Sequence, residues 1–390
     1  MRVTQVSFVA DGERRRGRAL LAAWPTLPAV AQAVASAGAH VTVVQPAHAD
    51  ETFRHEDVDY RFVNTSGSGV LDAANILSVL GAVREARPDV VHVQGLNTAR
   101  AIALLTRSLA GVPVIVQDHG SQAPRGWRRL ADRNAFASVA GVIFTAREQA
   151  LPWIHAGRLS PDVPVFEVME MSSGFAPGNQ VEARASTGMS GNPCLLWTGR
   201  LDANKDPLTV LAAFERVAER LPDARLWCCF GDAPLLRAVS ERIASSPVLR
   251  ERVVLLGRRP HAELELRFRA ADFFIQASHH EGSGYSVIEA LACGTTPIVT
   301  DIPSFRTIVG TAGALVPIDD VTSLATAIES WALGDRTAQR ARARAQFENR
   351  LTLERIGIDL LHAYHAVSRN HGQTAVRRQS HSALKVVARA

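Results

Sequence analysis

The sequence predicts an α/β protein made of two tandem Rossmann-like, doubly wound domains with a cleft between them. Three observations lead to this prediction. The chain has 390 residues, which is too long for one ordinary hydrophobic core. Short β-branched runs alternate with helical patterns along most of the chain, as in parallel sheets wrapped by helices. Residues 172–192, rich in Gly, Ser, Asn and Pro, lack an apolar period and divide the two series.

The elements of the N-terminal series follow from short apolar runs. Between the first two strands, Leu27, Val30 and Val34 fall on one helical face, and Gly38 ends the helix. Ligands of doubly wound sheets bind at the carboxyl ends of the strands, so the loops there are expected to carry the chemistry. Strands are predicted at residues 3–9, 40–44, 60–63, 90–93, 114–117 and 141–145.

The C-terminal series alternates more regularly. Its strands are predicted at residues 195–198, 225–230, 253–256, 273–276 and 297–299, and its helices at 207–221, 234–244, 261–270 and 286–293. We therefore place an N-terminal domain at 1–175, a linker at 176–192, a C-terminal domain at 193–350, a helix at 351–368 that we expect to pack back on the N-terminal domain, and a basic tail at 369–390.

The net charge of +5 comes from the C-terminal end of the chain. No acidic residue follows Asp359, but five basic residues do: Arg369, Arg377, Arg378, Lys385 and Arg389. Residues 1–359 are therefore electrically balanced. A solvated tail is the commoner interpretation of such an end, and peripheral contact with an anionic membrane at its inner face is the alternative. A nucleic-acid partner is not expected.

The cysteines and the apolar segments bear on the compartment. Cys194, Cys228, Cys229 and Cys293 show no CxxC spacing, so neither a zinc site nor a disulfide framework is predicted. The N-terminus lacks the pattern of a signal peptide, and prolines interrupt the apolar stretch at 19–45. We expect a cytoplasmic protein.

The loop after the strand at 195–198 carries two cations at a helix N-terminus. It begins at Gly199, contains Arg200 and Lys205, and ends at Asp206, a good helix N-cap. Lys205 is one of only two lysines among 43 cationic side chains. The exposed N–H groups and the helix dipole favour an anion there, and the two cations could clamp it. The alternative is that both are solvated surface charges.

A second candidate region spans residues 278–301. Gly282, Ser283 and Gly284 allow the backbone to approach a ligand closely, and the helix predicted from Ser286 offers further N–H donors.

Two carboxylates flank this turn. Glu281 lies in the loop, and Glu289 lies in the first part of the helix. For Glu289 a purely structural alternative exists, a capping box in which it bonds its own N-cap residue, Ser286. His279 and His280 suggest a metal, but adjacent residues of an extended segment point in opposite directions and no third ligand is evident, so no metal is expected.

Three runs carry a family resemblance: GRLDANKDP, LLGRRPHAELELRFRAADFFIQAS and EGSGYSVIEALACGTTPIVTD. Together they resemble the C-terminal domain of retaining nucleotide-sugar glycosyltransferases with the GT-B fold, the family-four type that includes sucrose-synthase-like and mannosyltransferase-like enzymes. Their hallmark, Glu-x7-Glu, is intact as Glu281 and Glu289. The resemblance covers roughly residues 190–320.

The resemblance implies a role for each matching residue. Arg200 and Lys205 match the basic pair that binds the donor diphosphate. Glu289 matches the carboxylate that hydrogen-bonds the donor ribose, and Glu281 matches the one beside the donor sugar. The family needs no metal, because cations and helix ends take that electrostatic role. The donor-binding set is completed by Gly199, Gly282, Ser283, Gly284 and Tyr285.

The N-terminal half departs from the family pattern. The usual Gly-Gly loop after the first strand is replaced by ADGERRRGRALLAAW, in which Arg14, Arg15, Arg16 and Arg18 cluster, so acceptor contacts cannot be carried over. The runs VVHVQG and VIVQDHG do resemble the family's strands. They place His119 where a histidine often approaches the donor sugar, although a histidine at a strand end is often structural.

The resemblance implies a retaining, metal-independent hexosyltransferase without a cofactor. The donor would be a UDP- or GDP-sugar, and the acceptor a hydroxyl of a glycan, a lipid-linked molecule or a small molecule, in glycan or glycolipid biosynthesis. The alternatives are a nucleotide-sugar epimerase of the same fold and an inactive nucleotide-sugar-binding protein. A pyridoxal-phosphate phosphorylase is disfavoured because neither lysine lies in a matching context, and an NAD(P) oxidoreductase because no GxGxxG follows a predicted strand.

Overall fold

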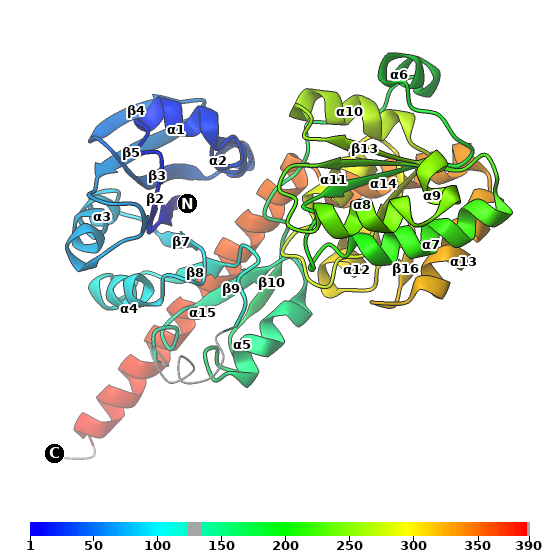
Figure 1. The fold of residues 1–390 in the computed structure, drawn as a ribbon. Helices are drawn as coiled ribbons and strands as arrows, with labels where there is room; N and C mark the ends of the chain where they lie inside the picture. The colour runs from blue at the N-terminus through cyan, green and yellow to red at the C-terminus, as the bar shows by residue number, and fades with distance from the viewer. Residues whose placement is uncertain (124–133, 388–390) are drawn as a thin grey trace. The chain divides into compact units, whose positions relative to one another are not determined.

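The chain folds into two compact α/β units. Figure 1 shows it as a computed structural model, which describes residues 1–123 and 134–387, with side chains up to residue 371. One unit consists of Met1–Met171 and Leu353–Ala390, and the other of Ser172–Thr352. Each contains a mainly or wholly parallel sheet flanked by helices, which confirms the predicted fold class.

The first unit is built on an eight-stranded sheet in the order β10-β9-β8-β7-β1-β3-β5-β4. The edge strand β4 pairs antiparallel with β5, and the other neighbours pair in parallel. The strands are β1 (Arg2–Ser7), β3 (His40–Ala47), β4 (Glu51–His55), β5 (Val58–Asn64), β7 (Val90–Gln94), β8 (Val114–Gln117), β9 (Gly141–Phe144) and β10 (Val165–Glu167), and a separate antiparallel pair is formed by β2 (Val9–Ala10) and β6 (Gly69–Val70).

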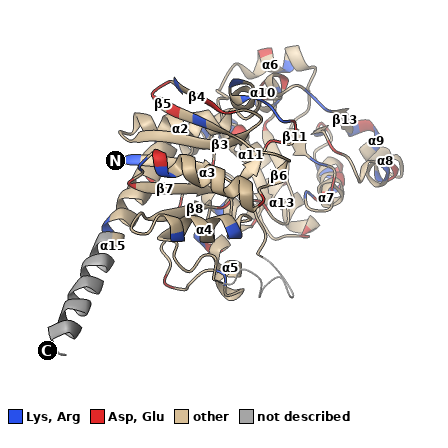
Figure 2. Cartoon of the chain, turned by 90° about the vertical axis from the view of Figure 1, so that its left-hand side faces the viewer, with Lys and Arg blue, Asp and Glu red and all other residues tan. Residues whose placement is uncertain are grey.

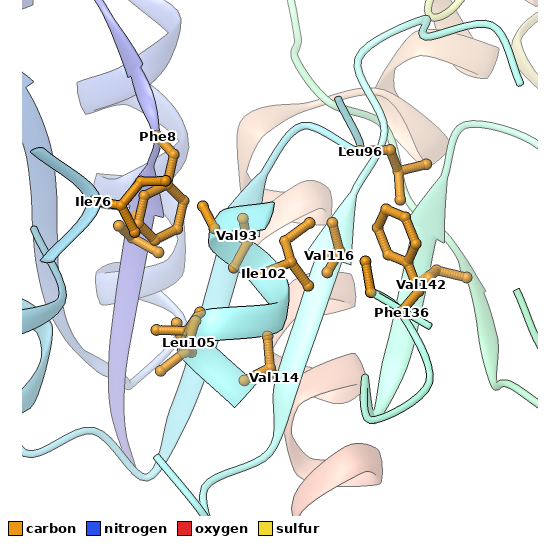
Figure 3. Close-up of a cluster of buried hydrophobic side chains, with 14 of the residues drawn as sticks. Phe8, Ile76, Val93, Leu96, Ile102, Leu105, Val114, Val116, Phe136 and Val142 are labelled. Carbon is orange, nitrogen blue, oxygen red and sulfur yellow. The ribbon is translucent and has the colours of Figure 1, made fainter. Parts of the chain in front are cut away.

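Apolar side chains from this sheet and its helices form a large buried cluster. Phe8 and Val93 from the sheet side meet Ile76 and Ile102, which come from α3 and α4 (Figure 3). Burial of such side chains is the main favourable contribution to folding. The helices before the chain crosses to the second unit are α1 (Gly17–Ala23), α2 (Thr26–Ser36), α3 (Ala73–Glu85), α4 (Ala99–Ser108) and α5 (Leu151–His155), and η2 (Arg147–Ala150) is a 3₁₀ turn.

The C-terminal helix α15 (Leu353–Val387) packs on α2 within the first unit. Gly357 permits the close approach, because a Cβ there would lie 2.2 Å from the carbonyl oxygen of Ala33. Tyr364 of α15 contacts the fully buried His92 of β7, with 2.8 Å between the Tyr364 Oη and the His92 Nδ1. Burial lowers the pKa of His92 to about 3, so this core contact is made by a neutral imidazole.

Helix α15 begins two residues after the start of the helix expected at 351–368, and it extends into the segment predicted as a basic tail. Residues 388–390 and the side chains from residue 372 onward lie outside the described part of the chain, and most of that predicted tail lies there.

The second unit is a six-stranded, fully parallel sheet in the order β13-β12-β11-β14-β15-β16. The first strand of the series, β11, lies at the centre, and the strand order reverses between β11 and β14. In doubly wound sheets this reversal marks the ligand-binding crevice. The strands are β11 (Cys194–Gly199), β12 (Arg225–Phe230), β13 (Val253–Gly257), β14 (Phe273–Gln276), β15 (Thr296–Thr300) and β16 (Ala314–Val316).

Helices cover both faces of this sheet. Trp197 and Phe273 from the sheet pack with Phe214 from α7 in a buried cluster, and all three are almost fully buried. The helices of the second unit are α6 (Gln180–Thr187), α7 (Pro207–Arg220), α8 (Leu236–Ala244), α9 (Pro247–Arg252), α10 (His261–Ala270), α11 (Tyr285–Ala292), α12 (Pro303–Val309), α13 (Val321–Ala332) and α14 (Arg336–Arg350).

The segment expected as a linker, residues 176–192, contains helix α6. Asn179 caps this helix through hydrogen bonds to two backbone N–H groups. Arg184 then pairs with Asp272 at 2.9 Å, and Gln180 donates to carbonyls at the end of α10. These polar contacts tie α6 to the second unit.

Basic and acidic residues are interspersed along both units (Figure 2). Among the residues that the structure describes, no single helix is both long and apolar enough to cross a membrane. Helices α1 and α2 meet that test of length and composition only as a pair bent by 93°.

Candidate active site

The candidate site of the second unit lies where its strand order reverses. Lys205 follows β11, and Glu281 follows the neighbouring strand β14. The Nζ of Lys205 pairs with Oε1 of Glu281, and these side chains are only 16% and 12% exposed. The structure therefore brings two predicted site residues together at the position where a doubly wound sheet binds its ligand.

The loop after β11 is held by its own aspartates. Asp202 accepts a hydrogen bond from the backbone N–H of Lys205 at 2.9 Å and pairs with Arg200 at 2.9 Å. Asp206 caps α7 by accepting from the backbone N–H of Thr209 at 3.2 Å. Arg200 remains 60% exposed, and its partner is Asp202 on the same loop instead of Glu281.

Asn204 joins the loops after β11 and β14. Its backbone carbonyl accepts from the N–H of His279 at 2.8 Å. Its side chain accepts from the N–H of His280 at 3.1 Å and donates to the carbonyl of His280 at 3.0 Å. Three hydrogen bonds thus fix Glu281 relative to Lys205. The sequence pattern did not single out Asn204, since an Asn in a polar loop carries no distinctive signal.

The glycine turn before α11 is shaped by packing. Gly284 has a φ of +61°, and a Cβ there would lie 2.5 Å from the ring of Phe305, so only glycine fits. Ser283 is buried, Gly282 is half-buried, and Tyr285 is 43% exposed.

Gly199, at the start of the other loop, faces Lys205. The Cγ of Lys205 lies 3.5 Å from the position of a Cβ on Gly199, which is an ordinary contact distance. A side chain at position 199 would therefore fit beside the aliphatic part of Lys205, so packing does not require a glycine there.

Glu289 contacts α10 instead of its own helix start. Its Oε1 lies 2.6 Å from Nε2 of His261, and the side chain is 11% exposed. Helix α11 begins at Tyr285 with Gly284 as N-cap and no side-chain capping bond. The capping-box alternative with Ser286 is therefore wrong, because the N-cap lies at Gly284, two residues before Ser286.

Burial governs the charge of Glu289. It raises the pKa of the carboxyl group, and the hydrogen bond and charge of His261 counteract part of that rise. His261 also contacts Phe175, with 4.7 Å between the ring centroids and 32° between the ring planes. The sequence had placed His261 only at the start of a helix, and its contact with Glu289 joins positions 28 residues apart.

His119, in the first unit, is held by two side chains. Its Nδ1 lies 2.5 Å from Oε2 of Glu170, which is 7% exposed, and its Nε2 lies 2.7 Å from Oε1 of Gln94. A carboxylate only accepts, so Nδ1 carries a proton. If the His119 ring is charged, its Nε2–H donates to the amide oxygen of Gln94. If the ring is neutral, Nε2 accepts from the Gln94 NH₂ group, with the amide turned over. Neither Glu170 nor Gln94 was singled out by the sequence.

His279 lies beside two carboxylates. His279 Nε2 lies 3.4 Å from Asp206 Oδ2 and 3.1 Å from Asp319 Oδ1, and the ligand atoms of these three residues all lie within 4.8 Å of one another. Both carboxylates therefore lie within ion-pairing distance of the His279 ring. The third potential ligand, Asp319, lies 40 positions further along the chain and could not be read from the local pattern.

The four cysteines are free and buried. Burial raises the pKa of Cys194 and that of Cys293 to about 12, so these thiols remain protonated and are poor nucleophiles.

Both halves of the chain match known families. Residues 22–157 match the family described as "Glycosyl transferase 4-like domain", and residues 192–332 match "Glycosyl transferases group 1".

Two curated relatives illustrate the similarity. The GDP-mannose:cellobiosyl-diphosphopolyprenol alpha-mannosyltransferase of Xanthomonas campestris is 28% identical over 291 residues, 70% of this chain and 70% of that protein. The D-inositol 3-phosphate glycosyltransferase of Mycobacterium sp. (strain JLS) is 32% identical over 174 residues, 43% of this chain and 39% of that protein.

Solved structures show the same fold at low identity. Sucrose-phosphate synthase from Thermosynechococcus elongatus has a TM-score of 0.61 at 19% identity, over 98% of this chain and 99% of that one. Anabaena HepE in complex with UDP and glucose has a TM-score of 0.66 at 16% identity, over 94% of this chain and 100% of that one.

Proposed function

Because this chain is a glycosyltransferase with the GT-B fold, we propose that it transfers a sugar from a UDP- or GDP-sugar to an acceptor hydroxyl and retains the anomeric configuration. The observation that carries this proposal is the meeting of Lys205 with Glu281 at the reversal of strand order in the second unit. A cation and a carboxylate at that position suit a diphosphate and the sugar attached to it.

In the proposed reaction the cations act on the leaving group. Lys205 and Arg200, at the N-terminal end of α7, attract the diphosphate and offset the charge that develops as the glycosidic bond breaks. The ammonium group of Lys205 has three donors, so it can contact a phosphate oxygen while it keeps Glu281 in place. No metal or other cofactor is required in this scheme.

The remaining site residues would bind other parts of the donor. Glu289, oriented by His261, accepts hydrogen bonds from the ribose hydroxyls, and Glu281 does so from the sugar. The exposed Tyr285 and the backbone of Gly282 and Ser283 complete the donor contacts. His119 approaches the sugar, with its ring orientation fixed by Glu170.

The acceptor is a glycan, a lipid-linked molecule or a small molecule. The names of two relatives include acceptors that carry phosphate, a diphosphopolyprenol-linked disaccharide and an inositol phosphate. This similarity supports a role in glycan or glycolipid biosynthesis.

We further propose that the chain works in the cytoplasm and touches the inner face of an anionic membrane. The free cysteines suit a reducing compartment, and a polyprenol-linked acceptor would require such contact. Flotation of the full-length chain with anionic vesicles, compared with neutral ones, tests the membrane contact.

The reaction can be tested with donors and acceptors in one NMR experiment. The chain is incubated with UDP- and GDP-sugars, with and without candidate acceptors, and the anomeric signals are followed. A new α-linkage from an α-linked donor is the expected product. An inverted linkage would contradict retention, epimerisation of the donor alone would favour an epimerase, and nucleotide binding without turnover would favour an inactive binding protein.

A further inference from the structure

Three buried polar side chains contact the loop that carries Glu281 and have no part in the proposed function. They are Gln276, the last residue of β14, Thr300, the last residue of β15, and Ser304, near the start of α12. Each is at most 1% exposed. Asn204 binds the same loop from the side of β11, so the loop is held from more than one direction.

Two of these side chains hold the backbone of the loop. The hydroxyl of Ser304 donates to the carbonyl of Glu281, with 3.1 Å between Oγ and the carbonyl oxygen. The hydroxyl of Thr300 donates to the carbonyl of Ser278, with 2.5 Å between Oγ1 and the carbonyl oxygen. Both donors are buried, so water competes little for either bond. The backbone at Glu281 is therefore fixed on the side of β15 and α12.

The third side chain, that of Gln276, contacts the carboxylate of Glu281 itself. Its Nε2 lies 3.5 Å from Oε1 of Glu281, the oxygen that also pairs with Nζ of Lys205. A carboxylate only accepts hydrogen bonds, so the NH₂ group of the amide must face it. The distance is long for a hydrogen bond, so the bond is a weak one. Gln276 and Lys205 thus approach the same oxygen from β14 and from the loop after β11.

The amide of Gln276 is unfavourable for the stability of the fold. The residue is 1% exposed, and among the residues that the structure describes its Oε1 has no hydrogen-bond partner. Its neighbours in sequence, Ile275 and Ala277, belong to the apolar core of the second unit. A buried acceptor without a partner destabilises a protein, and an apolar residue of similar size would avoid that cost. Stability alone therefore does not explain an amide at this position, whereas its contact with Glu281 does.

We infer that Gln276 and Ser304 are positioning residues for Glu281. Ser304 fixes the backbone from which the carboxylate extends, and Gln276 together with Lys205 fixes the direction of the carboxylate. Both positioning residues are buried, so they act through Glu281. This role rests on the proposed function in one respect, which is that Glu281 faces the donor sugar. The alignment of Lys205 with Glu281 can be measured without any donor.

The first test uses the two lysines of the chain as NMR probes. Lysine labelled in its side chain gives signals from Lys205 and Lys385 only, and Lys205→Ala assigns them. Gln276→Met and Ser304→Ala should each shift the Lys205 signal and increase its mobility on the nanosecond timescale, because the pair with Glu281 is then less well aligned. Glu281→Gln defines the signal of the broken pair. A residue whose variant leaves the Lys205 signal unchanged has no positioning role.

The second test separates positioning from a merely structural role. Gln276→Met is close in size but lacks the amide, so its free energy of unfolding should be unchanged or higher. Its kcat should nevertheless fall by about 10-fold or more, with little change in the KM for the donor, and Ser304→Ala should lower kcat similarly. Thr296→Val is the matched control. Thr296 is 1% exposed, its hydroxyl has no partner among the described residues, and it lies at the opposite end of β15 from Thr300, so this variant should be at least as stable with an unchanged kcat.

The two tests distinguish a failure of the proposed function from a failure of the positioning role. If the wild type transfers no sugar from any donor, the proposed function fails, and the Lys205 signals still decide whether Gln276 and Ser304 position the pair. If the wild type is active and both variants keep its kcat, the positioning role is overturned even where the Lys205 signal shifts. A Gln276→Met variant that loses stability together with activity would show that the amide supports the fold, and it would overturn the assignment of Gln276 as a positioning residue.

Discussion

Lys205 and Glu281, which are 76 residues apart in the sequence, form an ion pair between the loops that follow β11 and β14. The pair is largely buried, and Asn204 holds the two loops together beside it. Lys205 is therefore positioned before any donor arrives. In the proposed reaction the cation would therefore lose little side-chain freedom on meeting a diphosphate, which is a property of preorganised electrostatic sites.

Replacement of Lys205 should abolish most of the transfer. Lys205→Ala removes the fixed cation and leaves Glu281 without its partner, so we expect the rate to fall by at least ~100-fold. Lys205→Arg should remain strongly impaired, because a planar guanidinium cannot reproduce the end-on contact of an ammonium group. Initial rates with saturating donor measure the effect. Lys385→Ala, which removes the only other lysine, is the control, and near-normal turnover of Lys205→Ala would refute the role of Lys205.

Glu289 and His261 predict a pH dependence of nucleotide binding. Burial raises the pKa of Glu289, and in the proposed donor complex the ionised carboxylate is the stronger acceptor for the ribose hydroxyls, so affinity for UDP or GDP should increase as the pH rises through that pKa. His261→Ala removes the partner that lowers the pKa, so the midpoint should move to higher pH. Calorimetric titrations across the acidic range measure both midpoints.

Glu289→Gln is the reference for those titrations, because its curve contains only the titration of the nucleotide and of the other groups. The stability of the wild type should change with pH in the opposite direction to its nucleotide affinity. A carboxyl group whose pKa is raised on folding stabilises the fold below its unfolded pKa and loses that contribution as the pH rises through the folded pKa. The free energy of unfolding of the wild type should therefore fall, relative to Glu289→Gln, across that window. Identical pH profiles for both proteins would contradict the assignment.

Glu170 should act through His119. Glu170→Gln keeps the shape of the side chain but removes the charge that fixes the proton on Nδ1, so the ring loses its defined tautomer. We expect kcat to fall by up to about 100-fold, the loss caused by a small misplacement of a reacting group, with little change in the KM for the donor. ¹⁵N NMR of labelled histidine reports the tautomer directly, and an unchanged His119 spectrum with unchanged kcat would exclude this role.

Transfer should not depend on a divalent cation. Dialysis against a chelator should leave the rate unchanged, because Lys205 and the N-terminal end of α7 supply the positive charge. Among the residues that the structure describes, one group could offer a metal three ligands: Asp206, His279 and Asp319. Asp319→Ala is therefore the matched variant. A rate that collapses with chelator, recovers with Mn²⁺ and is lost in Asp319→Ala would show that a metal takes part.

The sequence indicated the parts of the site but not their contacts. Lys205 and Glu281 each follow a recognisable strand, and ligands of such sheets bind at strand ends, so both could be predicted. Their pairing could not, because it depends on β11 and β14 being neighbours in the sheet, which no local pattern encodes. Asn204, His261 and Glu170 were missed for the same reason, since their roles come from partners that are distant in sequence.

Errors in the fold prediction have local causes. Two strands at the edges of the first sheet, β4 and β10, were not predicted. Strand β4 is largely exposed, so its sequence lacks the apolar run of a buried strand. The capping box at Ser286 failed because Gly284, in a left-handed conformation, is the N-cap of α11, two residues before Ser286. That register directs Glu289 toward His261 instead of toward its own helix end.

The most direct test of the donor site compares nucleotide diphosphates with monophosphates. Calorimetric affinities for GDP, GMP, UDP and UMP are measured for the wild type, Lys205→Ala and Glu289→Gln. We predict that Lys205→Ala weakens diphosphate binding by about 10-fold or more and monophosphate binding much less, because it removes a charged contact to the second phosphate. Glu289→Gln should weaken both equally, since the ribose is common to them. A wild type that binds none of these nucleotides, or a Lys205→Ala variant that binds GDP and UDP normally, would contradict the account.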